Sequence, residues 1–434
     1  MKKILKLALL TLGLQPVFAQ QLSLKECVEI AVNNHPDYQS SVLNAELAGT
    51  DLDAAKSRRL PRMSLELYQS TNTGRSIDRF TNSYINEVYN STYTQASLSQ
   101  PIFQGFRIKN GIEASQLALK SSEEQAKAMQ NDLTVRIIQA YLTVLQSQEL
   151  VAVANSQVAS SREQENRVKL QVEAGTLGQK ELLQIQTQRA NDEYTLVNAK
   201  GSERQSRLNL FQLLNRPVDE TASFERIDAP ELVVAQYGVA KEEIYERLPE
   251  IKSSEFRIKS FDSQYKSIKA ENLPSLNFYA DWNTFYASSN PEQKFFEQIN
   301  ATRNGSFTLG LQIPIFGKFQ TSPRMQAAQV QKRIAQNQLR NAKLAVNRVY
   351  ESALQNYEIA GEQYQNTQNQ VAINSRNMQA VQSQIEAGTV NTLEYILAKT
   401  NLDRANSNLV QAKYQFLLQE KILQFYETGE WNLE

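Results

Sequence analysis

The chain has very little of the chemistry on which most catalytic and metal sites depend. Its 434 residues include one cysteine, Cys27, and one histidine, His35. A single cysteine excludes an internal disulfide, and a lone imidazole beside Pro36 does not supply a multi-histidine zinc site or a Ser-His-Asp triad. No glycine-rich stretch leads into the Lys-Ser or Lys-Thr of a phosphate-binding loop. We therefore expect no enzymatic activity, no cofactor and no bound metal.

Long apolar runs are also missing. Beyond the first 19 residues no window contains 18 consecutive apolar residues, so strands would have to carry the chain into any membrane. The first residues combine a basic start, a short apolar stretch over 4–14 and small residues before Gln20. This pattern predicts a signal peptide at 1–19 and export of the mature chain. Cys27 is then an internal residue, which we expect to be buried in a helix and not lipidated.

A strong excess of charge of either sign is absent as well. The formal net charge is +0, and removal of Lys2, Lys3 and Lys6 with the signal peptide changes it to about −3. Nothing in this balance indicates a nucleic-acid partner.

Glycine and proline are missing from two very long stretches. Residues 112–174 contain neither, and residues 324–387 contain only Gly361. Each stretch predicts a helix of about 100 Å at 1.5 Å per residue. In both, one set of residues recurs at alternating spacings of four and three, which is the heptad seam of a coiled coil. The seam residues are Leu133, Ile137, Ala140, Val144, Ser147, Val151, Ala154, Val158, Ser161, Glu165, Val168 and Val172, then Val346, Tyr350, Ala353, Tyr357, Ala360, Tyr364, Thr367, Val371, Asn374, Met378, Val381 and Ile385.

The two stretches belong to a duplication. Leu60-Pro61 returns 213 residues later as Leu273-Pro274, and the tetrapeptide Glu-Ala-Gly-Thr at 173–176 returns at 386–389 with the same offset. A period this long indicates two equivalent half-molecules and not a solenoid. We divide the chain into a signal peptide (1–19), a first repeat (20–217, with a strand pair over 62–102 and a helical hairpin tip near 174–177), a linker (218–240) and a second repeat (241–434, with a strand pair over 274–316 and a tip near 387–390).

Each repeat carries two segments that alternate between apolar and polar residues, as strands with one buried face do. In the second repeat the alternation runs over 276–286 and 306–313, and the first repeat has a weaker version over 63–68 and 95–99. Each predicted strand is about 10 to 12 residues long, the length that a tilted strand needs to cross a bilayer. Pro101 and Pro314 follow the second strand of each pair, and we expect them to end the strand and turn the chain from sheet to helix.

Four strands leave two unpaired edges, which a membrane does not tolerate. Three copies of the chain would supply twelve strands and close one barrel with a polar lumen. The sequence thus predicts a mixed α and β membrane protein, internally duplicated, with four strands per chain in a trimeric 12-stranded barrel continued by a long α-helical coiled-coil tunnel. An alternative of a different class is a periplasmic or secreted coiled-coil scaffold without a pore, which fractionation without detergent would distinguish.

In order and spacing these features resemble the TolC-like outer-membrane efflux proteins. The resemblance covers nearly the whole mature chain and includes Gln100–Phe103, Ile313–Phe316, the tips at Gly175 and Gly388, and the segment Leu208–Pro217. It implies a homotrimer in the outer membrane, in contact with its lipid, with a tunnel of about 100 Å in the periplasm. It also implies an exit duct of a tripartite efflux or type I secretion system. Such a duct passively conducts substrates delivered by a periplasmic adaptor and an inner-membrane RND, ABC or MFS transporter.

The resemblance also implies that the two hairpin tips meet the adaptor. Gly175 and Gly388 are expected to end the long helices with left-handed backbone. Thr176 and Thr389 are expected to cap the helices that follow, Thr176 with Gln179 as a capping box.

The resemblance further places a constriction at the acidic residue six positions after each tip glycine. These residues are Glu181 and Glu394, and a trimer would gather six carboxylates, whose mutual repulsion favours uptake of protons or cations. The family's second acidic position, one turn later, is Leu397 here, with Gln184 in the first repeat. Two forms of the gate stay open, a single carboxylate ring or a partly apolar ring that closes by dewetting. A third reading is that the glutamates only complement the helix dipoles.

Overall fold

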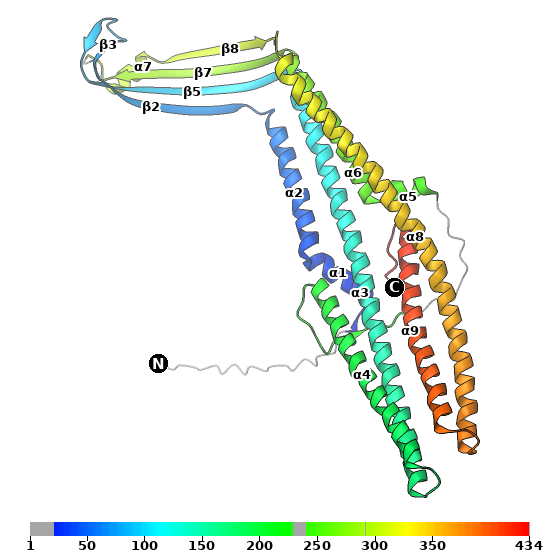
Figure 1. Ribbon diagram of the computed structural model, residues 1–434. Coiled ribbons are helices and arrows are strands. Elements are labelled where there is room, and N and C mark those ends of the chain that lie inside the picture. Colours follow the sequence, from blue (N-terminus) through cyan, green and yellow to red (C-terminus); the bar gives the residue numbers. More distant parts are fainter. Residues whose placement is uncertain (1–20, 229–239, 291, 434) are drawn as a thin grey trace, which may run out of the picture. The chain divides into compact units, whose positions relative to one another are not determined.

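The computed structural model describes residues 21–228, 240–290 and 292–433 (Figure 1). They form two compact units, each assembled from both halves of the sequence. The first unit consists of the chain up to residue 40, residues 128–248 and the chain from residue 345 onward. The second unit consists of residues 41–127 and 249–344. The compact units therefore cut across the two predicted repeats. The expected signal peptide lies outside the described residues, as do residues 229–239 of the expected linker.

The first unit is helical, with one small sheet. Its helices are α1 (Leu24–Asn34), the C-terminal part of α3 (Arg107–Glu173), α4 (Gln179–Leu213), α5 (Lys241–Arg247), the C-terminal part of α8 (Lys318–Glu386) and α9 (Thr392–Thr428). The short strands β1 (Gln21–Leu22) and β6 (Ser223–Phe224) pair in parallel. β6 lies inside the segment 218–240, so part of the predicted linker is an ordered strand.

An apolar core joins α1, α3, α4, α9 and the β1–β6 pair. Tyr141 of α3 is fully buried, packs edge-on against Phe224, and donates hydrogen bonds from its hydroxyl to the carbonyl oxygens of Leu22 (2.9 Å) and Glu225 (2.8 Å). The Tyr141 hydroxyl thus provides a hydrogen-bond partner for one carbonyl oxygen on each chain segment of the β1–β6 pair. Burying these carbonyl oxygens without a partner would cost free energy of folding. α1 adds Cys27 to the same core, with 0% exposure, as predicted. Burial raises the pKa of this thiol to about 12, so it stays protonated and unreactive.

The two long helices follow the prediction closely. α3 has 67 residues and α8 has 69, and every residue of both predicted heptad seams is buried or half-buried. Among the described residues α3 alone is long and apolar enough in one stretch to cross a membrane by length and composition, and 44% of that stretch is buried inside the protein. Packing of Ile137, Ile138 and Leu142 in the core accounts for this composition.

The second unit contains a four-stranded antiparallel sheet. Its strands are β2 (Arg62–Asn72), β5 (Tyr89–Gln104), β7 (Ser275–Ala287) and β8 (Asn304–Gln312), in the order β2-β5-β7-β8 (Figure 1). The two predicted strand pairs are present and are joined through β5 and β7, whose registered partners include Ala96 with Trp282 and Leu98 with Ala280. The connections also contain a hairpin of β3 (Arg75–Ile77) and β4 (Tyr84–Asn86), and a helix α7 (Phe295–Ala301), which were not predicted.

The sheet has one apolar and one polar face, as the alternation predicted. Cross-strand partners match in character, with Phe278 opposite Leu309 and Leu276 opposite Leu311 on the apolar face. On the single chain this face is uncovered, and Leu65 and Phe307 are 72% and 82% exposed. Soluble monomers rarely expose so large a set of apolar side chains, and this face marks a lipid or protein contact.

The transition from sheet to helix corrects one prediction. Pro101 does not end β5, because the strand continues to Gln104 with a bulge between Pro101 and Phe103. A bulge tolerates a proline because one residue there leaves the ladder. The turn lies at Gly105 and Phe106, both with positive φ (58° and 69°). Pro314 does follow the end of β8, two residues beyond Gln312.

The remaining helices of the second unit run from the sheet. They are most of α2 (Pro36–Ser57), the N-terminal parts of α3 and α8, α6 (Pro249–Lys269) and the 3-10 turn η1 (Ala270–Asn272). Gly105 is required where β5 meets η1, because a Cβ there would lie 2.6 Å from Leu273 Cβ and 2.8 Å from Ala270 O. Serine hydroxyls hold α3 to α6. The Ser121 hydroxyl donates to Ser253 O at 2.8 Å, and the Ser260 hydroxyl donates to Ala114 O at 2.8 Å.

Candidate functional site

The turn between α3 and α4 is a compact hydrogen-bonded loop. Gly175 has φ 75°, and its N–H donates to Val172 O at 3.0 Å while Thr176 N–H donates to Gln171 O at 2.9 Å. This pair of bonds is the Schellman motif, in which left-handed backbone at one residue satisfies two otherwise unpaired carbonyls. The predicted left-handed glycine is therefore confirmed.

The turn between α8 and α9 repeats this geometry. Gly388 has φ 71° and donates to Ile385 O at 3.1 Å, and Thr389 N–H donates to Gln384 O at 2.9 Å. Nothing lies within 4 Å of a Cβ built on either tip glycine. Both turns are thus open to a partner on their outer side.

The predicted threonine caps are wrong. Thr176 and Thr389 donate their hydroxyls backward to Gln171 O (2.9 Å) and Gln384 O (3.0 Å), because each threonine stands only one residue past the left-handed glycine. The following helices begin later. Gly178 precedes α4 without a side-chain cap, and Asn391 caps α9 by accepting a hydrogen bond from Glu394 N–H at 3.0 Å.

The two predicted gate glutamates lie in the first turns of α4 and α9. They differ in setting. Glu181 is half-buried and its carboxylate folds back over Gly178, so that a Cβ at that glycine would lie 2.8 Å from Glu181 Oε2. Glu394 is exposed, and Leu397, one turn later, is 55% exposed.

Each glutamate precedes a residue of one buried cluster. Leu182 and Tyr395, together with Val168 and Ile185, are the buried members of an apolar group that packs the first hairpin against the second. The structure of one chain therefore brings both helix starts to the same cluster. Glu394 and Leu397 remain on the surface of the chain.

A buried ionic cluster behind the tips was missed by sequence reasoning. The Lys399 ammonium, with 3% side-chain exposure, donates to Asp192 Oδ2 at 2.9 Å and to Asp403 Oδ2 at 2.6 Å. Asp192 also accepts hydrogen bonds from the Ser161 hydroxyl and from Gln188 Nε2 at 2.8 Å. The cluster joins α3 and α4 of one hairpin to α9 of the other. Only the spacing of four between Lys399 and Asp403 could have suggested it, because the 213-residue offset places Gln186 and Ala190 at the equivalent positions.

Known proteins supply the context for this geometry. The sequence profile of the outer membrane efflux protein family matches the chain twice, over residues 27–216 and 241–426. The alkaline protease secretion protein AprF of Pseudomonas aeruginosa is 24% identical, with 93% of this chain and 84% of AprF covered.

Solved structures share the fold. The chain superposes on CusC with a TM-score of 0.82 at 17% identity, covering 95% of this chain and 94% of CusC. It superposes on the Campylobacter jejuni outer membrane channel CmeC with a TM-score of 0.80 at 17% identity, covering 95% and 86%.

The chain belongs to the outer membrane efflux protein family. Its place is the outer membrane, with its helices extending into the periplasm. This assignment replaces the alternative of a periplasmic or secreted scaffold.

Proposed function

We propose that three copies of the chain form one outer-membrane channel. The observation that carries this proposal is the sheet of the second unit. In it β2 and β8 are edge strands among the described residues, and one face exposes Leu65, Phe307 and Leu309 among other apolar side chains. An edge strand inside a bilayer leaves backbone groups without partners at a cost of several kcal/mol each. Pairing of β2 from one copy with β8 of the next removes every edge and gives a twelve-stranded barrel with the polar face inward.

The trimer is proposed to act as the exit duct of a tripartite efflux or type I secretion system. An inner-membrane RND, ABC or MFS transporter supplies the energy and selects the cargo, and a periplasmic adaptor docks on the duct, which conducts passively. Family membership and the likeness to AprF, a secretion protein, support a role in export. The polar lumen face, with Gln95, Ser97 and Asn283 among its residues, suits passage of hydrated solutes without a fixed binding site.

The hairpin tips are the proposed contacts of the adaptor, and the helix starts behind them are the proposed gate. The exposed turns at Gly175-Thr176 and Gly388-Thr389 support the first assignment. Exposure of Glu394 and Leu397 on the same side of α9 supports the second, with Glu181 as the weaker partner because its carboxylate folds back over its own helix start.

Assembly is tested on the mature chain extracted from membranes. Light scattering in detergent, corrected for bound detergent, should give the mass of a trimer, and the same sample should form discrete conducting units in planar bilayers. A monodisperse monomer that does not conduct contradicts the proposal. Recovery of the protein in the soluble fraction without detergent contradicts it as well.

A further inference from the structure

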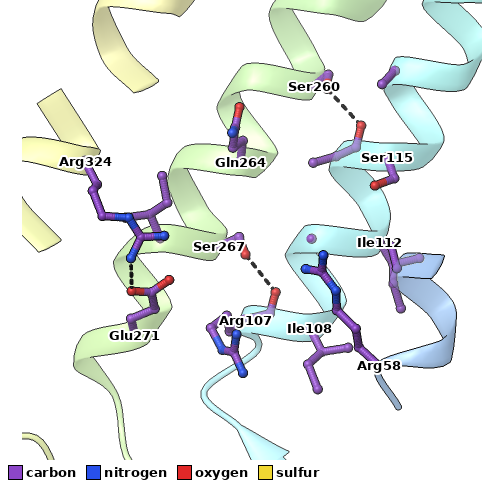
Figure 2. Close-up of a pocket in the computed structure, with 15 residues that line it drawn as sticks. Arg58, Arg107, Ile108, Ile112, Ser115, Ser260, Gln264, Ser267, Glu271 and Arg324 are labelled. Atoms are coloured by element: carbon purple, nitrogen blue, oxygen red, sulfur yellow. Dashed lines mark hydrogen bonds and ion pairs between the residues drawn. The ribbon is translucent and has the colours of Figure 1, made fainter. Parts of the chain in front are cut away.

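Two cavities lie in the second unit where the strands meet the helices. The first, about 400 Å³, is lined by α2, α3, α6 and α8 and contains the side chains of Arg58, Arg107 and Arg324 (Figure 2). The second, about 540 Å³, is lined by the β5–α3 turn, η1 and the start of α8. On α6, the first cavity is lined by Ser260, Gln264 and Ser267, and the second is lined by Lys266 and Lys269. These two sets lie on opposite sides of a helix with 3.6 residues per turn.

The first cavity continues the polar face of the sheet. Arg107 donates to Gln104 Oε1 at 3.0 Å, and Gln104 donates to Asn277 Oδ1 at 2.7 Å. Asn277 alternates along β7 with the apolar Leu276 and Phe278 and so belongs to the polar face. This cavity lies on the side proposed to be the lumen. Its charge is partly neutralised by Glu271, which binds Arg324 at 2.5 Å (Figure 2).

The second cavity continues the apolar face. Phe106, at its edge, packs edge-on against Phe103 with ring centroids 5.4 Å apart. Phe103 is the registered partner of Leu276, so both side chains point to the apolar face. In an outer-membrane protein this face meets lipid, and the helical end of the strands is the periplasmic end. The second cavity therefore lies at the level of the lipid headgroups of the periplasmic leaflet.

The lining of this second cavity is chemically distinctive. It is mostly apolar, with Phe106, Leu273 and Met325 among its walls, and three lysines border it. Lys266 is paired with Asp262 at 2.8 Å. Lys269 and Lys318 form no ion pair with any described residue and are exposed. Two uncompensated ammonium groups beside an apolar hollow at a membrane surface are suited to a lipid that carries a negative phosphate and an acyl chain.

We infer that this cavity is a binding site for an anionic glycerophospholipid of the periplasmic leaflet. The phosphate lies against the ammonium groups of Lys269 and Lys318, and one acyl chain enters the hollow between Phe106, Leu273 and Met325. Gly105 is part of the site, because any Cβ there would push Leu273 away from its present position. The inference rests on the proposed orientation of the sheet, with its apolar face toward lipid. All residues of the site come from one chain, so binding does not require the trimer.

Binding is measured by native mass spectrometry of the detergent-purified protein titrated with phosphatidylglycerol or with phosphatidylcholine of the same acyl chains. We expect phosphatidylglycerol to bind more tightly by at least about tenfold. Lys269→Gln with Lys318→Gln should weaken its binding about 25-fold, at roughly fivefold per lysine near an anionic lipid. Met325→Trp should fill the hollow and weaken binding of both lipids with the charges intact. The matched control is Lys180→Gln with Lys200→Gln, which removes the same charge from α4 and should change nothing.

Equal binding of the two lipids overturns the inference, and so does an unchanged affinity in the Lys269 and Lys318 double variant. Preference for lipopolysaccharide over phosphatidylglycerol also overturns it, because that lipid belongs to the opposite leaflet. The mass of the sample separates this result from the proposed function. A monomer that prefers phosphatidylglycerol supports the lipid-binding site and contradicts the trimeric channel. A trimer that binds both lipids equally supports the channel and contradicts the lipid-binding site.

Discussion

Lys399 shows how one residue can stay charged in a buried position. Burial opposes its charged form, but the hydrogen bonds and charges of Asp403 and Asp192 outweigh that effect and hold the pKa of this ammonium above its usual range. Removal of the lysine would leave Asp192 buried with an uncompensated charge, which costs several kcal/mol. The cluster therefore depends on all of its members, and each hairpin of the chain supplies at least one.

Glu394 is the single residue on which the proposed gate depends most. Glu394→Gln removes three charges from one ring in a trimer while nearly keeping side-chain shape. A divalent cation about 7 Å from three carboxylates loses about 1 kcal/mol of attraction per carboxylate in a water-like medium, or about 3 kcal/mol for the ring. Block by periplasmic divalent cations should therefore weaken by about 100-fold. Conductance of the closed channel should rise in planar bilayers.

Glu181→Gln should have a smaller effect on the same measurements, because its carboxylate folds back over Gly178. The control is Glu220→Gln, an equal change in the exposed segment after the far end of α4. If Glu394→Gln and Glu220→Gln conduct and are blocked alike, the glutamates serve only the helix dipoles, and Leu397 becomes the residue to substitute.

At the level of elements, the helical hairpin is the unit that the adaptor is proposed to contact. Gly175→Val and Gly388→Val place a β-branched residue where φ is 75° and 71°. Left-handed backbone costs an ordinary residue about 1–2 kcal/mol, which lowers the population of the native turn about 5- to 30-fold. We expect crosslinking to the adaptor and export to fall while the yield of trimer is kept.

The matched control for the tips is Gly201→Ala. Gly201 lies inside α4 with no neighbour within 4 Å of a built Cβ and without positive φ, so alanine should be tolerated or stabilising. Adaptor crosslinking that stays at the parent level in both valine variants would assign docking to another part of the helices.

The sequence predicted the elements well where one periodic signal determined them. Seam residues such as Val346 and Tyr350 are buried because a heptad repeat specifies both the helix and the face that packs. Predictions failed where several local solutions compete. Pro101 can end a strand or occupy a bulge, and Thr176 can cap the next helix or close the previous one. The Asp192–Lys399 pair could not be predicted, because its partners are 207 residues apart and neither repeats in the other half.

At the scale of the whole molecule, the proposed barrel is closed by a heterologous contact between β2 and β8 of neighbouring copies. Repetition of a heterologous contact either closes into a ring or produces an open filament. The proposed trimer is a closed ring of three copies. Thr308→Cys on β8, combined in turn with Ser64→Cys, Glu66→Cys or Tyr68→Cys on β2, should give a covalent trimer at one register. Paired strands hold opposite Cα atoms about 4.5–5.5 Å apart, within the range of a disulfide.

Non-reducing electrophoresis in SDS reports the outcome. Each cysteine alone should give only monomer, because Cys27 is fully buried. A ladder that extends beyond three copies would indicate an open assembly, and absence of crosslinks at every register would contradict β2–β8 pairing.

The assembly of each compact unit from both halves of the sequence has a consequence for biogenesis. The sheet is complete only when β5 meets β7, and Asn90 N–H bonds to the Ser288 hydroxyl 198 residues along the chain. Closing so long a loop carries an entropic cost before any ladder contact forms, and folds dominated by distant pairings form slowly. During translocation the β2–β5 pair therefore stays unpaired on its β5 side, with its apolar residues exposed, until the second half of the chain has also been translocated. A chaperone that holds the strands β2 and β5 apart from other chains during this interval would raise the yield of folded protein, whereas the first half expressed alone could complete neither unit.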